Sequence, residues 1–182
     1  MEKDVKKILI TNEQIIARCK EIGKKITEDY KGKRPLVIGL LNGSVPFMSE
    51  LIKNIDLYVK IGFIRATSYY GGTQTTGEVI IQKDSDISVK DQDVIIVEDI
   101  IDSGYTLDAI VHLLNKRGAK SVSIATLLDK KEKRIKQVEV QYVGFDIPDE
   151  FVIGFGLDYN EYYRNLPYIG VLKEEVYKRG SI

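Results

Sequence analysis

The fold is decided by Val94-Ile95-Ile96-Val97-Glu98-Asp99-Ile100-Ile101-Asp102-Ser103-Gly104-Tyr105-Thr106-Leu107. Its first four residues are apolar and β-branched, which predicts a strand buried on both faces, as in a parallel sheet. The Asp-Ser-Gly-Tyr-Thr segment then predicts a turn, and the apolar spacing after it predicts a helix. The stretch therefore indicates a strand, a loop and a helix in succession, the repeating unit of an α/β sheet.

Two acidic residues, Glu98 and Asp99, directly follow the apolar run. Open α/β sheets bind ligands outside the carboxyl ends of their strands, so both residues are candidates for a site. Their carboxylates can accept hydrogen bonds from a vicinal diol such as that of a ribose, directly or through Mg²⁺.

The turn after these acids suits the other end of such a ligand. Its backbone N–H groups from Asp102 to Thr106, its two hydroxyls and the positive end of the next helix can hold a phosphate monoester. Gly104 permits the tight backbone that this requires. The alternative is purely structural: Asp102 or Ser103 caps the helix and the acids are solvated.

The composition is that of an ordinary globular chain of 182 residues, 43% of them hydrophobic, which suffices for one sizeable core. Lys+Arg and Asp+Glu both number 27, so no global basic field favours nucleic acid or an anionic membrane. Cys19 is the single cysteine and lies in an apolar helical stripe, so we expect a buried thiol and no intrachain disulfide. No apolar stretch reaches membrane-spanning length and the first residues lack the apolar core of a signal peptide, so we expect a cytoplasmic protein.

Helices and strands are expected to alternate along the rest of the chain. Helices are predicted at 11–30, 45–53 and 107–117, the first opened by a capping box of Thr11 and Gln14. Strands are predicted at 36–41, 56–66, 78–83 and 121–128. His112, the single histidine, falls off the apolar face of its helix, so no histidine catalyst or metal site is expected.

Three connecting segments each allow a functional and a structural interpretation. The strand-glycine-helix corner at 42–44 can bind an anion or be a bare turn. The glycine-rich segment 68–77 can be a lid over a site or an exposed hairpin connection. The charged run 129–134 would ordinarily be a solvated loop, but its place after a strand draws attention to Lys130.

The stretch 94–107 resembles the phosphoribosyl-pyrophosphate (PRPP) signature of type I phosphoribosyltransferases, which is an apolar run, Glu/Asp-Asp, two apolar residues and Asp-x-Gly-x-Thr. Leu-Asp-Tyr-Asn-Glu-Tyr at 157–162 narrows the resemblance to the hypoxanthine-guanine members, and the similarity extends from about 36 to about 172. It implies an α/β fold of three layers, a mainly parallel twisted sheet flanked by helices, with a small hood formed by terminal segments. It also implies one phosphoribosyltransferase domain over 1–182, with its core at about 36–130 and the hood and purine-binding region mainly at about 140–182.

The resemblance also implies a set of residues for the ribose, phosphate and metal end of the site. PRPP would be bound by Glu98, Asp99, Asp102, Ser103, Gly104, Tyr105 and Thr106. Mg²⁺ would be held by Glu98, Asp99 and Asp158. Pyrophosphate would be bound by Leu41, Asn42, Gly43, Ser44 and Arg164. In the family the first peptide of that loop is often cis, and mammalian-type members carry lysine where this chain has Asn42.

The purine end and the catalytic residues follow from the same resemblance. Lys130 would donate to the 6-oxo group of the purine, Phe151 would stack on the base, and Val152 would read its edge through the backbone. Asp158 would also border the purine. Asp102 would handle the N7 proton, and Ser68 and Tyr69 would close over the reaction centre and exclude water.

The implied function is purine salvage: transfer of 5-phosphoribosyl from PRPP to N9 of hypoxanthine or guanine, giving IMP or GMP and pyrophosphate. Mg²⁺ is the implied cofactor, and the family suggests a homodimer or homotetramer with no nucleic-acid or membrane partner. The alternative is a regulator that keeps the PRPP fold and binds a nucleotide or RNA without turnover. The neutral composition shows no basic face for RNA, which favours the enzyme.

Overall fold

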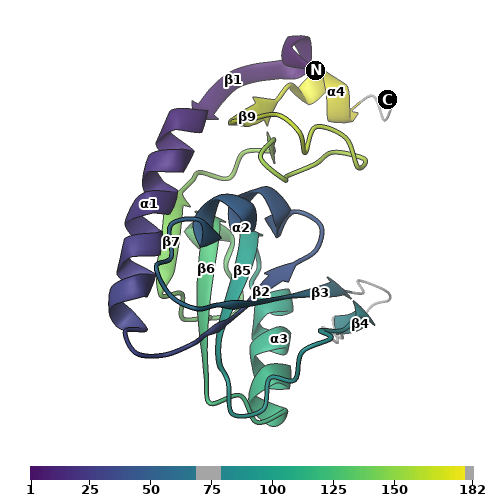
Figure 1. Ribbon diagram of the computed structural model, residues 1–182. Coiled ribbons are helices and arrows are strands. Elements are labelled where there is room, and N and C mark those ends of the chain that lie inside the picture. Colours follow the sequence, from purple (N-terminus) through teal and green to yellow (C-terminus); the bar gives the residue numbers. More distant parts are fainter. Residues whose placement is uncertain (69–78, 179–182) are drawn as a thin grey trace.

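The computed structural model describes residues 1–68 and 79–178, and it shows a sheet covered by helices with a smaller sheet above it (Figure 1). The large sheet has the strand order β4-β3-β2-β5-β6-β7. All of its neighbouring strands are parallel except β3 and β4, which are antiparallel at one edge. Its strands are β2 (Leu36–Leu40), β3 (Lys60–Ser68), β4 (Val79–Lys83), β5 (Asp93–Ile101), β6 (Ser121–Asp129) and β7 (Tyr142–Asp146). The predicted α/β fold with a mainly parallel sheet is confirmed.

Strand β5 lies in the interior of the large sheet, between β2 and β6, and its β-branched residues are buried on both faces. Val94, Ile95, Ile96 and Val97 are all 0% exposed. Alternate residues point to opposite faces of a sheet, and these four divide accordingly: Ile95 and Val97 belong to one core cluster, and Val94 and Ile96 to the other. The predicted double-sided burial is therefore correct.

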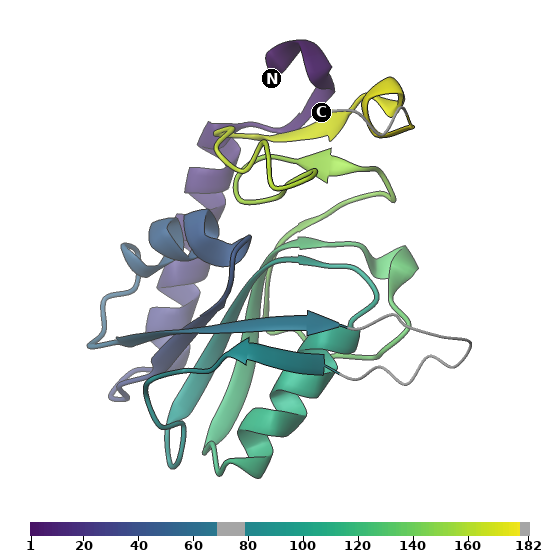
Figure 2. The same cartoon turned by 90° about the vertical axis from the view of Figure 1, so that its right-hand side faces the viewer.

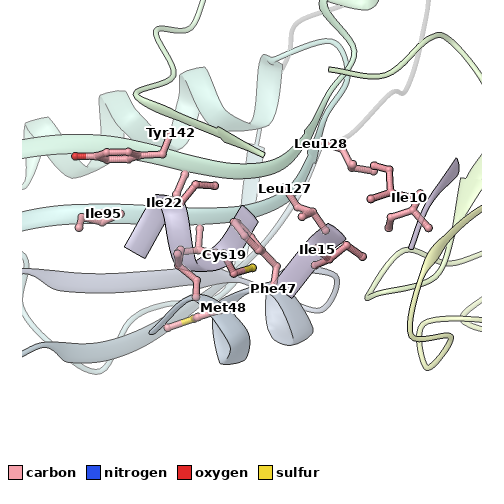
Figure 3. Close-up of a cluster of buried hydrophobic side chains, with 14 of the residues drawn as sticks. Ile10, Ile15, Cys19, Ile22, Phe47, Met48, Ile95, Leu127, Leu128 and Tyr142 are labelled. Atoms are coloured by element: carbon pink, nitrogen blue, oxygen red, sulfur yellow. The ribbon is translucent and has the colours of Figure 1, made fainter. Parts of the chain in front are cut away.

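Three helices cover the large sheet, two on one face and one on the other. The first core cluster contains residues of α1 (Asn12–Asp29) and α2 (Ser44–Ile52), and Figure 3 shows Cys19, Phe47 and Met48 meeting side chains of the sheet there. The second cluster contains residues of α3 (Tyr105–Lys116). The predicted capping box opens α1, and burial raises the pKa of the Cys19 thiol to about 12, as expected for a structural cysteine.

The smaller sheet unites segments from the two ends of the described chain. It has the order β1-β9-β8, and all its pairs are antiparallel. Figure 2 shows it above the end of the large sheet where the parallel central strands β2, β5 and β6 finish, so it can form the roof of a site. Its elements are β1 (Val5–Ile10), β8 (Val152–Ile153) and β9 (Ile169–Leu172), with the short helix α4 (Glu174–Lys178) after β9; two 3₁₀ turns, Glu2–Asp4 and Lys131–Lys133, complete the described elements.

Several predicted boundaries differ from the observed ones. The strand expected to begin at residue 56 begins at Lys60, and the helix expected from residue 45 begins at Ser44. His112 is solvent-facing as predicted, with its side chain 78% exposed. No helix within 1–68 or 79–178 is both long and apolar enough to cross a membrane.

Candidate active site

The loops after β2, β5 and β6 meet at one end of the sheet because these strands are parallel neighbours. The loop after β2 touches the end of β5 where Gly43 lies against the Asp99 side chain. A Cβ atom on Gly43 would lie only 1.6 Å from Oδ2 of Asp99, so only glycine lets the carboxylate rest against the loop at 41–44. The peptide bond between Leu41 and Asn42 is cis, as is common in the family that the sequence resembles.

Glu98 and Asp99 form a pair of carboxylates at the end of the central strand. The Asp99 N–H donates to Oε1 of Glu98 over 3.2 Å, and the Ile100 N–H donates to Oδ1 of Asp99 over 2.8 Å. Burial, and then the like charge of Asp99, raise the pKa of Glu98 well above its usual range. A bound cation would relieve this repulsion.

This pair fits Mg²⁺, which takes oxygen ligands and is often held by one or two carboxylates together with substrate phosphates. No group of three or more His, Cys, Asp or Glu side chains suited to a metal gathers in the part of the chain that the structure describes.

The turn after β5 is shaped by Gly104, which has a φ of 85° and directly precedes α3 without a side-chain cap. The alternative in which Asp102 or Ser103 caps the helix is therefore wrong. The Ser103 carbonyl accepts hydrogen bonds from the N–H groups of Ile135 and Lys136, both 3.0 Å long. In a trans peptide the N–H points opposite to the carbonyl, so the Gly104 N–H points away from that loop.

The turn borders a first cavity of about 280 Å³. Six of the residues predicted for PRPP and pyrophosphate line it: Leu41, Glu98, Asp102, Ser103, Gly104 and Thr106. A second cavity of about 320 Å³ is lined by predicted purine-binding residues, namely Lys130, Phe151 and Val152, together with Leu157 of the hood. Asp102 and Ile100 line both cavities, so the two meet at the end of β5.

Lys130 is held at the second cavity by a buried ion pair on its own loop. Asp129 is 1% exposed and receives two hydrogen bonds from Arg134, 3.0 Å from Nε and 2.7 Å from Nη2. Lys130 itself is 8% exposed, and its Nζ lies 3.5 Å from Oδ1 of Asp149. The interpretation of 129–134 as a wholly solvated loop is therefore wrong, because charge pairing lets these side chains be buried.

The hood meets the loop at 41–44 through Gly156, where a Cβ atom would lie 1.9 Å from the Gly43 carbonyl oxygen. Arg164 donates to the Gly156 carbonyl over 2.7 Å, which places its guanidinium near that loop. Its Nη2 also lies 3.0 Å from Oδ1 of Asp158. In this structure the Asp158 carboxylate, which was predicted to bind metal, is paired with the Arg164 guanidinium.

Arg65 contacts the loop at 41–44, and it was not among the site residues predicted from the sequence. It lies near the carboxyl end of β3, and its guanidinium donates to the side-chain oxygen of Asn42. The parallel pairing of β2 and β3 places it beside the loop at 41–44. A positively charged residue near the carboxyl end of the neighbouring strand was the feature of the sequence that could have predicted this contact. Ser68 ends β3 opposite Val79, and Tyr69 lies outside the described residues. The roles of all these residues remain predictions.

This chain is similar to known proteins in both sequence and structure. The model of the phosphoribosyl transferase domain matches residues 6–160. A hypoxanthine-guanine phosphoribosyltransferase of Streptococcus agalactiae is 54% identical over 98% of this chain and 99% of its own. The crystal structure of a hypoxanthine phosphoribosyltransferase from Staphylococcus aureus is 52% identical, with a TM-score of 0.94 over 97% of this chain and 96% of its own.

A more distant structure is the hypoxanthine phosphoribosyl transferase of Trypanosoma cruzi, studied for the role of its C-terminal region in oligomeric state and enzymatic activity. It is 37% identical, with a TM-score of 0.93 over 98% of this chain and 96% of its own.

Proposed function

We infer the reaction from family membership: this chain belongs to the phosphoribosyltransferase family, and it transfers 5-phosphoribosyl from PRPP to hypoxanthine or guanine in purine salvage. The products are IMP or GMP and pyrophosphate. The comparisons give no support to the alternative of a regulator without turnover.

One observation carries the assignment of the site: Asp102 and Ile100 line both cavities. A phosphoribosyl group in the first cavity and a base in the second would bring ribose C1′ and purine N9 together beside Asp102. N7 and N9 belong to the same five-membered ring of the purine. A carboxylate beside N9 is therefore also close to N7, and Asp102 can take up the proton that N7 loses when N9 bonds to C1′. Transfer by a positioned acid or base typically contributes about 10²–10⁴-fold in rate.

The residues at the second cavity suit a 6-oxopurine. Lys130 has only donor hydrogens, so it can meet a 6-oxo group but not the amino group of adenine. The Val152 carbonyl would accept the N1 hydrogen of hypoxanthine or guanine. Phe151 supplies an apolar ring on which the base can stack.

The leaving pyrophosphate would be held by the loop of Leu41, Asn42, Gly43 and Ser44 and by Arg164, whose positive charge offsets the negative charge that develops on departure. Mg²⁺ held by Glu98 and Asp99 would supply further charge neutralisation at that end of the site. Ser68 and Tyr69 would exclude water from the ribosyl centre, which water could otherwise hydrolyse.

The wider assembly is part of the same proposal. Residues 1–182 would act as one domain, with the large sheet holding PRPP and the hood holding the purine. A cytoplasmic homodimer or homotetramer is the form that the family suggests.

The test is pyrophosphate release from PRPP in the presence of Mg²⁺ and one purine at a time. Release with hypoxanthine and guanine, with IMP and GMP recovered, is the expected result. Tight binding of PRPP or IMP without release for any purine would instead favour the regulator.

A further inference from the structure

The ring of Phe151 is fixed by two tyrosines that come from different parts of the hood. Tyr159 meets it nearly at a right angle, with ring centroids 5.7 Å apart and an interplanar angle of 84°. Tyr177, on α4, stacks on it with centroids 5.0 Å apart and an angle of 18°. Both geometries are those preferred by aromatic pairs, so Phe151 belongs to a three-ring cluster.

Phe151 also faces the second cavity. It lines this cavity with Lys130 and Val152, and 41% of its surface remains exposed. A flat ring has two faces, and Tyr177 covers one of them. A base that enters from the cavity therefore stacks on the other face, so that the base, Phe151 and Tyr177 form successive layers.

The helix that carries Tyr177 packs on the hood through two neighbouring side chains. Tyr177 and Val176 pack against a buried cluster that includes Ile153 and Leu172. The backbone of Phe151 is tied to β9 by a 2.9 Å hydrogen bond from the Leu172 N–H to the Phe151 carbonyl. The two stacked rings are thus attached to adjoining parts of the hood.

We propose that Tyr177 is a positioning residue for the purine: it holds the Phe151 ring in the orientation on which the base stacks. A half-exposed phenylalanine without such a partner has several rotamers, and binding a base would have to restrict it to one. Tyr177 imposes this restriction before the base arrives. The inference rests on the proposed function, since it takes the second cavity to be the purine site.

The test compares a ligand that contains the base with one that lacks it. Calorimetry with IMP and with Mg²⁺-PRPP gives the two dissociation constants, and initial rates give KM for hypoxanthine and kcat. For Tyr177→Ala we expect IMP binding to weaken and KM for hypoxanthine to rise by about three- to tenfold, the effect of losing one aromatic pair. PRPP affinity and kcat should stay within about twofold of the wild type.

Three further variants separate positioning from general stability. Tyr177→Phe keeps the ring and should restore IMP affinity, whereas Tyr177→Leu keeps apolar bulk without a ring and should behave like Tyr177→Ala. Tyr168→Ala is the matched control, because Tyr168 packs against the same hood cluster but its ring lies beside Gly170. It should lower the melting temperature without a selective loss of IMP.

The outcomes distinguish this inference from the proposed function. A wild type that neither binds IMP nor uses hypoxanthine would overturn the function itself. An active wild type whose Tyr177→Ala and Tyr177→Leu variants keep full IMP affinity, or lose IMP and PRPP affinity equally, would overturn the role of Tyr177 alone.

Discussion

Replacing Arg134 by alanine is expected to destabilise the protein by about 3–5 kcal/mol, because it leaves a buried carboxylate without its partner. The Asp129 side chain is 1% exposed, and Arg134, 14% exposed, gives it two hydrogen bonds. Bonds to charged groups contribute about 1.5–3 kcal/mol each, so two of them account for this range. A third bond, 2.8 Å from Nη1 to the Val138 carbonyl, closes the loop.

Urea unfolding at neutral pH measures this loss. With a slope of about 2 kcal/mol/M, the midpoint should fall by about 1.5–2.5 M while the slope stays constant. The same loop carries Lys130, so kcat/KM for hypoxanthine should fall as well. The matched control is the double variant Asp129→Leu/Arg134→Met, which removes both charges and should recover most of the stability. A midpoint shift in Arg134→Ala below about 0.5 M would refute the buried ion pair as the anchor of this loop.

Three other substitutions test the site. Asp102→Asn should lower kcat by on the order of 10²–10⁴-fold with an almost unchanged melting temperature; a lower melting temperature with normal kcat would assign Asp102 to the turn alone. The wild type should prefer hypoxanthine to adenine by at least roughly a hundredfold in kcat/KM, and Lys130→Ala should reduce this ratio; comparable use of both bases by the wild type would contradict the reading of the 6-oxo group. Gly43→Ala should weaken calorimetric Mg²⁺-PRPP binding by roughly tenfold or more, since a Cβ atom 1.6 Å from Asp99 Oδ2 forces the carboxylate away; unchanged affinity would show that this close approach is dispensable.

The sequence predicted the elements that form because of interactions between residues close together in the chain. The β-branched run before Glu98 can be satisfied only by burial on both faces, and Thr11 with Gln14 bond to one another within one turn. The sequence predicted a strand over 56–66, but not which of its two faces is the more deeply buried. Ile64 is 0% exposed and Ile61 is 42% exposed, because the packing of α3 on the sheet decides this.

Contacts that depend on how the chain folds back on itself were outside the reach of these patterns. The burial of Asp129 depends on a side chain that folds back over the strand end, and nothing in a charged run distinguishes this from solvation. The stacking of Phe151 on Tyr177 joins a residue that precedes β9 in the sequence to one that follows it. The resemblance to a family named Phe151 but not the ring behind it, since that ring lies outside the motifs.

The pairing of β1 with β9 has a consequence for synthesis on the ribosome. Val5 pairs with Leu172, and at about 5–20 residues per second the second strand emerges roughly 10–30 s after the first. During this interval neither edge of β1 has a partner, and unpaired strand edges are prone to association with other chains. The strands β2, β5 and β6 are all made before β9, so the nascent protein can assemble the large sheet and the loops of the first cavity while the smaller sheet above them is still incomplete.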